Sequence, residues 1–334
     1  MSFTVKIQPS GHSFTVEENE RILDAALKAG ISFPYGCRSG GCWACRGTVL
    51  EGEIDYGDFT PRFSEEEIAN KSALFCVSTA TSDLTIEMKE ISATKDIQIK
   101  NLPTRVHEME KLSDDVMKVK LLIPPTERLQ FLSGQYIEII MKDDRRRAFS
   151  IANAPFDDKF LELHIKYIPG GDFTEYVFNE MKVRDLLRFE GPLGTFTLRE
   201  ESMRPIIMLA TGTGFAPIKS ILEHAFSEGV KRPIYFYWGG RHERDFYMDE
   251  QVKAWAEQHS NLNYIPVASQ PSENWQGRTG HIQTAVLEDF NSLAGYEVYA
   301  CGNPAMVQEG FELLTKKGVK PENYLSDAFT FSSK

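Results

Sequence analysis

The chain has 334 residues, of which 42% are hydrophobic and 25% charged, and its net charge at pH 7 is −11. This composition is ordinary for a globular protein of two or three domains. No apolar run reaches the length of a membrane span, and the acidic balance argues against nucleic acid as a partner.

The first predicted elements form a small β-rich domain over residues 1–93. Alternating apolar residues predict strands, and a period near 3.6 predicts helices. The N-terminal residues lack the charged start and apolar core of a signal peptide, so we expect none. The predicted strands are 3–7, 13–16, 47–51 and 84–88, and residues 73–75 form an apolar stretch without an assigned element. The predicted helices are 21–29 and a short one that opens with a capping box at 64–67.

Four cysteines in this region carry the most specific motif of the chain. Cys37, Cys42 and Cys45 read Cys-x4-Cys-x2-Cys, and Cys76 follows after 30 further residues. Three thiolates on one loop and a fourth from elsewhere are the pattern of plant-type [2Fe-2S] ferredoxins. Glycines between them let backbone N–H groups point toward the negative charge of a cluster. The sequence therefore predicts a [2Fe-2S] cluster held by these four residues, in a ferredoxin domain with a β-grasp-like fold.

Two alternatives for the cysteines are weaker. Structural zinc usually takes two short Cys-x2–4-Cys pairs, which this spacing does not provide. A disulfide framework fits poorly with five cysteines in 334 residues. With most cysteines assigned to iron, we expect a reducing, cytoplasmic location. Trp43, inside the loop, either shields the cluster or faces a partner, and the sequence does not decide between these roles.

The charge of this first domain leaves its meaning open. Residues 1–93 carry 8 Lys and Arg against 14 Asp and Glu, a net charge of −6. Such a balance fits an acidic docking face for a basic protein partner, and it fits plain solubility equally well.

A linker and a second domain are expected next. Residues 94–103 are polar and mixed and end at Pro103, so we expect a linker there. Short strands separated by turn residues then dominate residues 104–200, which predicts an antiparallel β-barrel. The predicted strands of this domain are 116–123, 136–141, 161–167 and 186–190.

The segment 147–150 of this second domain has the groups that a flavin needs. Arg147 supplies a cation for a diphosphate, Phe149 an aromatic ring beside an isoalloxazine, and Ser150 a hydroxyl. Arg147 and Phe149 share one face of an extended strand. An exposed strand would explain so short a motif about as well. Downstream, the N–H of Gly171 and the hydroxyl of Thr174 are candidates for binding phosphate.

After residue 204 the pattern changes to buried strands that alternate with helices, over residues 201–334. Such alternation predicts a doubly wound α/β domain with a parallel sheet. The strands are expected at 205–210, 234–238, 264–268 and 297–300, and the helices at 216–227, 249–259 and 305–317.

Two strand ends of this third domain carry candidate nucleotide-binding residues. Gly212, Thr213 and Gly214 follow the first strand and precede a helix, where backbone N–H groups favour a pyrophosphate. Cys301 and Gly302 follow the fourth strand, at the edge where such sheets bind ligands. Cys301 is either a buried small residue or part of a nicotinamide site.

Taken together, the motifs resemble a known family over essentially the full length of the chain. The chain resembles the bacterial NADH-dependent iron–sulfur flavoprotein reductases, in which a plant-type ferredoxin domain precedes FAD and NAD domains like those of ferredoxin–NADP reductase. The subgroup that looks closest is that of CDP-6-deoxy-glucoseen reductases, which supply electrons in deoxysugar synthesis. Reductase components of phenol hydroxylases and other aromatic oxygenases share nearly the same plan. The motifs that carry the resemblance are the four cysteines, 147–150, 212–214, 301–304 and the C-terminal 326–329.

The resemblance implies roles for individual residues. Arg147, Phe149 and Ser150 would hold FAD, although Phe149 stands where many relatives have Tyr, so one hydroxyl contact is absent. Phe329 would lie against the flavin until nicotinamide displaces it. The remaining implied roles are FAD phosphate contacts from Gly171 and Thr174, NADH pyrophosphate contacts from Gly212, Thr213 and Gly214, a nucleotide border at Gly239 and Arg241, and a nicotinamide contact from Cys301 beside Gly302.

The implied activity is an electron-transfer chain that ends on another protein. A hydride would pass from NADH to FAD, and single electrons would leave through the cluster to a dehydrase or an oxygenase partner. NADH is favoured over NADPH because no cation follows the third strand until Arg278. A redox-sensing module and a reductase of free flavin are the alternatives from other classes. The intact nucleotide motifs argue against the first, and the ferredoxin domain argues against the second.

Overall fold

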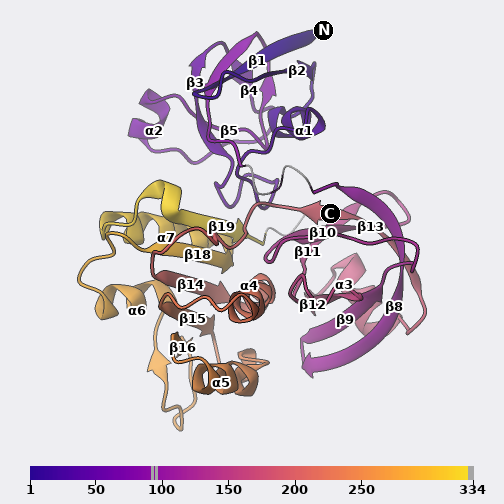
Figure 1. The fold of residues 1–334 in the computed structure, drawn as a ribbon, viewed down its shortest axis with the longest axis vertical. Coiled ribbons are helices and arrows are strands. Elements are labelled where there is room, and N and C mark those ends of the chain that lie inside the picture. Colours follow the sequence, from indigo (N-terminus) through magenta and orange to yellow (C-terminus); the bar gives the residue numbers. More distant parts are fainter. Residues whose placement is uncertain (92–93, 95–96, 330–334) are drawn as a thin grey trace. The chain divides into compact units, whose positions relative to one another are not determined.

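The computed structural model describes residues 1–91, 94 and 97–329 (Figure 1). These residues form two compact units. The first comprises the described residues of 1–97, together with 194–196 and 326–329, and the second comprises Gln98–Leu193 and Thr197–Leu325. No helix among the described residues is long and apolar enough to cross a membrane.

A five-stranded mixed sheet organises the first unit. Its strands follow the order β2-β1-β7-β3-β5, in which β1 and β7 run parallel and the other pairs run antiparallel. Helix α1 (Ile22–Lys28) buries its apolar side chains beside this sheet. The sheet strands are β1 (Ser2–Gln8), β2 (Ser13–Glu17), β3 (Arg46–Glu51), β5 (Ser72–Leu74) and β7 (Leu84–Glu87), and a separate pair consists of β4 (Ile54–Asp55) and β6 (Thr79–Ala80).

The predicted capping box is present at the start of α2 (Glu65–Ala69). The Ser64 hydroxyl accepts from the N–H of Glu67 at 3.3 Å, and the Glu67 carboxylate accepts from the N–H of Ser64 at 2.8 Å. Two otherwise unpaired backbone donors are thereby satisfied, which explains why so short a helix begins at this residue.

Six antiparallel strands form the first half of the second unit, in the order β11-β10-β13-β8-β9-β12. An isolated bridge between Ile151 and Leu163 joins the two ends of this order, so the sheet curls into the predicted barrel. Its buried interior includes Ile137, Leu163 and Phe189. The elements are β8 (Lys100–Ser113), β9 (Val116–Leu122), β10 (Tyr136–Ile140), β11 (Arg146–Ser150), β12 (Phe160–Lys166), β13 (Leu186–Leu193) and the helix α3 (Asp172–Asn179).

The expected linker at 94–103 needs correction at one end. Residues 95–96 lie outside the described residues, and 100–103 form the start of β8 rather than a linker. Pro103 pairs with Arg188 within the sheet, so this proline does not end the polar stretch as the sequence suggested.

A parallel sheet forms the other half of the second unit, in the order β17-β16-β15-β14-β18-β19. Helices α4 and α5 lie on one face of this sheet and α6 and α7 on the other (Figure 1). The elements are β14 (Ile206–Thr211), β15 (Ile234–Gly240), β16 (Leu262–Ala268), β17 (Arg278–Thr279), β18 (Glu297–Gly302), β19 (Tyr324–Ala328), α4 (Phe215–Ser227), α5 (Asp249–Gln258), α6 (Ile282–Asp289) and α7 (Pro304–Lys316).

The strand order reverses between β14 and β18. Connections from β14 lead to β15 and β16 on one side, whereas β18 pairs with β14 on the other. Ligands of doubly wound sheets bind at the carboxyl ends of the strands at such a switch point. The fold therefore brings the predicted glycine motif after β14 and the predicted Cys301 motif at the end of β18 to one place.

Candidate functional site

The loop that carries Cys37, Cys42 and Cys45 directs backbone N–H groups at sulfur. The N–H of Cys42 lies 3.3 Å from the Cys37 sulfur, and that of Ser39 lies 3.5 Å from it. These contacts require unusual backbone conformations, with φ angles of +52° at Arg38 and +79° at Gly40. A hydrogen bond from the Cys42 thiol, opposed by burial and assisted by these N–H groups, lowers the pKa of Cys37 to about 5.

The four cysteines meet as two pairs. The thiol of Cys37 contacts that of Cys42, and the thiol of Cys45 contacts that of Cys76. Within the described part of the chain, no three Cys, His, Asp or Glu side chains converge on a position for a single metal ion. Paired thiols suit a cluster of two irons, because four cysteines are shared between the two metals.

The side chains around this loop are tied to one another. Arg38 forms an ion pair with Asp24 at 2.6 Å, and Arg46 forms one with Glu67 at 2.6 Å. The half-buried Trp43 ring stands edge-on to Phe63 with 5.5 Å between centroids, and the Arg46 guanidinium lies 5.7 Å from the centre of the Trp43 ring. Trp43 is thereby fixed at the edge of the loop.

Two segments distant in sequence also hold the cysteine loop within the first unit. The Thr195 hydroxyl accepts from the N–H of Tyr35 at 2.7 Å and donates to the carbonyl of Tyr35 at 3.0 Å. The Ser326 hydroxyl donates to the carbonyl of Cys42 at 2.7 Å. Gly36 is required here, because a β-carbon would lie 2.8 Å from the Asp327 carboxylate. Burial, together with the charge of Cys37, raises the pKa of Asp327 to about 7.

Sequence reasoning missed these supporting residues. Ser326 and Asp327 lie in the C-terminal segment 326–329, in which the sequence indicated a role for Phe329 alone. Their nearness to Phe329 in the sequence was the one feature that could have pointed to them. Phe329 directly follows β19 and is half-buried.

The predicted flavin residues lie on β11 at one end of the barrel sheet. Ser150 is 5% exposed, and its buried hydroxyl has no hydrogen-bond partner among the residues that the structure describes. A buried hydroxyl of this kind is costly unless a ligand completes it. Phe149 is half-buried against Phe173, with 5.3 Å between ring centroids, and Arg147 is half-buried on the same face. These residues fit an aromatic, anionic ligand such as a flavin nucleotide.

The residues expected near the flavin phosphates already have partners. The N–H of Gly171 donates to the carbonyl of Ile168 at 2.9 Å, and the Thr174 hydroxyl donates to the carbonyls of Ile168 and Gly171 at 3.0 Å each. Both residues shape the turn that opens α3. Their expected contact with FAD phosphates stays a prediction.

The two nucleotide motifs of the parallel sheet are in direct contact. A β-carbon on Gly214 would lie 2.3 Å from the carbonyl oxygen of Cys301, and one on Gly302 would lie 2.4 Å from the Thr211 hydroxyl. Gly302 also has a φ of +124°, which side chains rarely adopt. Cys301 itself is fully buried. Glycine is thus required at both positions for the strand ends to approach.

The remaining predicted residues line the same edge of the sheet. Gly212 to Gly214 form a single 3₁₀ turn that leads directly into α4, and Thr213 is buried within it. The Trp238 indole donates to the carbonyl of Gly212 at 3.2 Å. A β-carbon on Gly239 would lie 3.2 Å from the Thr211 side chain, so Gly239 packs closely against Thr211. Arg241 is exposed, and its backbone N–H donates to the Asp245 carboxylate at 2.6 Å.

An open pocket of about 730 Å³ lies beside this edge, between the loops that follow β15 and β16. Glu243 spans the two loops, because its carboxylate accepts from the N–H of Ser272 at 2.9 Å and from the Ser272 hydroxyl at 2.6 Å. Hydrogen bonds from Ser272 lower the pKa of Glu243, so it is ionised at neutral pH. Arg278, the cation that the sequence singled out, pairs with Glu288 and Asp289. The pocket instead contains Arg244, which the sequence did not suggest.

Comparison with known proteins decides the family. Residues 5–81 match the 2Fe-2S iron-sulfur cluster binding domain, 103–198 the oxidoreductase FAD-binding domain, and 208–310 the oxidoreductase NAD-binding domain. The chain is 39% identical over 329 residues to the CDP-6-deoxy-L-threo-D-glycero-4-hexulose-3-dehydrase reductase of Yersinia pestis, covering 98% of this chain and 99% of that protein.

The chain belongs to the iron–sulfur flavoprotein reductases that draw electrons from NAD(P)H. This chain is also similar to the terephthalate 1,2-dioxygenase reductase component 2 of a Comamonas species. The two are 31% identical over 334 residues, with 98% of each chain covered. The crystal structure of the Amycolatopsis cytochrome P450 reductase GcoB superposes with a TM-score of 0.79 at 30% identity, covering 99% of this reductase and all of that chain.

The family confirms the three cofactors predicted from the sequence. The reductase has a [2Fe-2S] domain, an FAD domain and an NAD domain, and its fold is that of a small ferredoxin sheet, an antiparallel flavin-binding sheet and a parallel nucleotide-binding sheet. The paired cysteines, the unpartnered Ser150 hydroxyl and the glycine-lined strand ends fit these groups.

Proposed function

We propose that this reductase takes a hydride from NADH and delivers the electrons, one at a time, to a partner enzyme of deoxysugar synthesis. FAD accepts electrons in pairs and releases them singly, and the cluster carries one electron at a time. The observation that supports the proposal is the close contact between Gly214 and Cys301, because both residues come from motifs expected to bind NADH and meet at the switch point of the sheet.

In this proposal, separate sets of residues bind FAD, NADH and the cluster. Ser150 orients the flavin through its hydroxyl, Phe149 packs beside the ring, and Arg147 neutralises the diphosphate. Gly212, Thr213 and Gly214 receive the NADH pyrophosphate, with Gly239, Arg241 and Gly302 bordering the nucleotide. Cys301 borders the nicotinamide, and Phe329 shields the flavin when nicotinamide is absent. Cys37, Cys42, Cys45 and Cys76 bind the cluster.

Glu243 supports NADH as the donor. Dinucleotide-binding folds select NADH with a carboxylate that accepts a hydrogen bond from the 2′-hydroxyl of the adenosine ribose. Glu243 provides an ionised carboxylate in the pocket between the loops after β15 and β16. The same charge repels the 2′-phosphate of NADPH.

The identity of the partner rests on the relatives. The dehydrase reductase of Yersinia pestis is 39% identical to this chain, whereas the terephthalate dioxygenase component is 31% identical. We therefore propose as acceptor a dehydrase that acts on a CDP-linked deoxyhexulose. The second candidate, supported by the oxygenase relative, is the terminal component of an aromatic oxygenase.

A paired reconstitution tests this proposal. Purified reductase and NADH are mixed either with a CDP-6-deoxy-L-threo-D-glycero-4-hexulose-3-dehydrase and its substrate, or with a terephthalate dioxygenase and terephthalate. The dehydrase reaction should form product, and the oxygenase reaction should not exceed background. Product from the oxygenase alone would favour the second candidate.

A variant that lacks one cluster ligand controls for direct transfer of electrons from the flavin to the dehydrase. Cys76→Ser should retain NADH-dependent reduction of ferricyanide but lose delivery to the dehydrase. Loss of ferricyanide reduction as well would indicate damage to the whole chain, and Cys45→Ser then repeats the test at a second ligand.

A further inference from the structure

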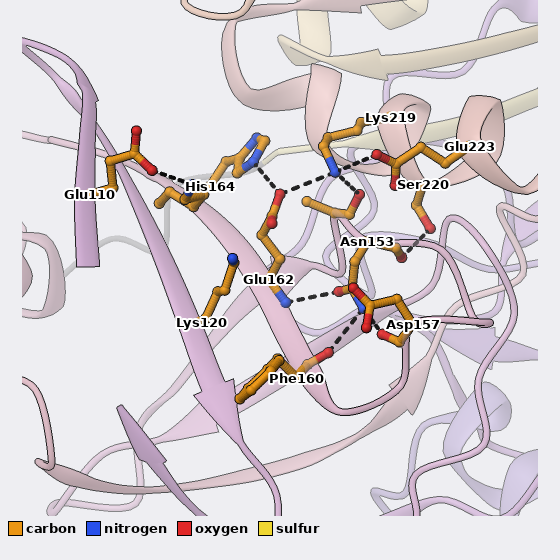
Figure 2. A network of polar contacts seen from close by, with 12 residues as sticks. Glu110, Lys120, Asn153, Asp157, Phe160, Glu162, His164, Lys219, Ser220 and Glu223 are labelled. Carbon is orange, nitrogen blue, oxygen red and sulfur yellow. Dashed lines mark hydrogen bonds and ion pairs between the residues drawn. The ribbon is translucent and has the colours of Figure 1, made fainter. Parts of the chain in front are cut away.

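A buried network of charged and polar side chains joins the barrel to the parallel sheet (Figure 2). Glu162 and His164 alternate along β12 and share one face, and their side chains are 12% and 0% exposed. Lys219 on α4 contacts Glu162 from the nucleotide-binding half, with a side chain that is 8% exposed. Charged side chains are rarely buried to this degree unless they are paired with one another.

Lys219 is the centre of the network. Its ammonium lies 3.2 Å from the carboxylate of Glu162 and 2.9 Å from that of Glu223, and it donates to the carbonyl of Ala152 at 3.3 Å. Beside it, the Ser220 hydroxyl donates to the carbonyl of Asn153 at 2.7 Å. Ala152 and Asn153 lie two and three residues after Ser150. Helix α4 is therefore hydrogen-bonded to the backbone that continues from the flavin segment.

His164 extends the network to the opposite side. Its Nε2 lies 3.1 Å from Glu162, and its Nδ1 lies 3.0 Å from the Tyr247 hydroxyl. Burial lowers the pKa of His164, so the ring is neutral, with one donor and one acceptor. Because the Glu162 carboxylate only accepts, Nε2 carries the proton and Nδ1 accepts from Tyr247. Burial also raises the pKa of Tyr247 well above its usual range, which keeps that donor protonated.

Both ends of the network adjoin the 3₁₀ turn at Gly212–Gly214, which is the turn expected to bind the NADH pyrophosphate. Helix α4 begins immediately after Gly214. The Tyr247 ring stands edge-on to Trp238, with 5.2 Å between centroids, and the Trp238 indole holds the carbonyl of Gly212. The network thus connects the segment after Ser150 with the turn that would bind NADH.

We propose that Lys219, Ser220 and the three hydrogen-bonded residues Tyr247, His164 and Glu162 are positioning residues. Together they set the distance between nicotinamide and flavin. Hydride transfer requires reacting atoms about 3–3.5 Å apart, and small misplacements are costly in rate. A buried polar network whose members are all hydrogen-bonded rigidifies the structure and specifies one arrangement of the elements that it joins. This inference rests on the proposed hydride transfer from NADH to FAD.

Two conservative variants with matched controls test the positioning role. Ser220→Ala removes the bond to Asn153, and Tyr247→Phe removes the bond to His164 while keeping the ring. Their controls lose equivalent bonds within one half of the unit. Ser227→Ala loses a 2.9 Å bond to His224 on the same helix, and Tyr264→Phe loses a 2.8 Å bond to Asp249.

The first readout is single-turnover reduction of the flavin by NADH in the holoprotein. Ser220→Ala and Tyr247→Phe should each lower the limiting rate constant about tenfold, while the apparent Kd for NADH changes less than twofold. The controls should keep the wild-type rate constant. A structural role alone would lower the thermal stability of variants and controls alike and leave the rate constants equal.

The second readout does not depend on turnover. Hydrogen exchange of residues 215–227 in the oxidised holoprotein should be faster in Ser220→Ala and Tyr247→Phe than in their controls. Variants that match their controls in both readouts would overturn the inference. If wild-type protein itself fails to reduce flavin with NADH, the proposed function fails, and hydrogen exchange still decides whether the network joins the two halves.

Discussion

The carbonyl oxygen of Cys301 lies where a side chain on Gly214 would begin. A β-carbon at Gly214 would stand 2.3 Å from that oxygen and 2.7 Å from the Cys301 carbonyl carbon. Both contacts are with backbone, which cannot move aside as a flexible side chain would. The 3₁₀ turn after β14 and the end of β18 are therefore packed so closely that Gly214 has no room for a side chain.

Gly214→Ala tests this contact. The added methyl group should push the 3₁₀ turn away from β18, at a cost of about 1–3 kcal/mol in the free energy of unfolding. Because the turn carries the N–H groups that would bind pyrophosphate, KM for NADH should rise at least tenfold. Thermal unfolding and steady-state kinetics measure the two effects. Unchanged stability together with unchanged KM would contradict the close packing.

Ser150→Ala tests the flavin site. The Ser150 hydroxyl is buried without a partner among the described residues, so its removal should leave the stability of the FAD-free protein unchanged or slightly improved. Flavin reduction by NADH should slow about tenfold, equivalent to ~1.4 kcal/mol in the barrier. Stopped-flow absorbance gives the rate constant, and denaturant unfolding gives the stability. A clear loss of stability without any kinetic effect would place the hydroxyl in the fold and not at the flavin.

Glu243→Gln tests the choice of nucleotide. Removing the negative charge should raise kcat/KM for NADPH about tenfold and lower that for NADH by less, because the neutral amide still accepts from the ribose hydroxyl. Glu250→Gln, an exposed carboxylate on α5 paired with Lys253, serves as the control for net charge. An unchanged ratio of NADH to NADPH efficiency in Glu243→Gln would remove Glu243 from nucleotide recognition.

The buried Glu162 should give the reductase an acid-dependent component of stability. Burial opposes ionisation, but the hydrogen bond from His164 and the charge of Lys219 prevail and lower the pKa of Glu162 to about 2. A carboxyl group with a depressed folded-state pKa stabilises the fold above its unfolded pKa near 4.5, and this stabilisation is lost as pH falls toward 2.

Urea unfolding of wild type and Glu162→Gln at several pH values measures this component. Wild type should be more stable by about 3 kcal/mol at pH 7, and the gap should narrow between about pH 4.5 and the lowest pH at which the protein folds. A gap that stays constant across this range would mean that Glu162 is not ionised in the folded protein.

Local patterns in the sequence predicted the elements that depend on near neighbours. The capping box at Ser64, the buried strand of β14 and the cysteine loop all arise from residues close together in the chain. Backbone N–H groups aimed at the Cys37 sulfur depend on positive φ angles at Gly40, which the glycine signalled, and at Arg38, which nothing in the sequence signalled. The same kind of pattern predicted the three domains in order, and resemblance to a family then supplied the expected roles of individual residues.

Local sequence patterns could not predict the contacts between segments that are distant in the chain. Thr195 and Ser326 bond to the cysteine loop across 160 and 284 residues, and a single Thr or Ser carries no local sign of such a partner. Glu243 was missed because a nucleotide determinant was sought after β16, whereas the determinant that we propose lies in the loop after β15. Lys219 looks like an ordinary helix residue until β12 buries it.

An anaerobic titration with NADH, followed by visible absorbance and electron paramagnetic resonance, tests the central claim most directly. NADH should bleach the flavin absorbance, and the resonance signal of a one-electron-reduced [2Fe-2S] cluster should then appear. In Cys76→Ser the flavin should still bleach while the cluster signal is absent. Wild-type protein that carries both cofactors but shows no cluster signal after the flavin bleaches would contradict the proposed passage of electrons from NADH to the cluster.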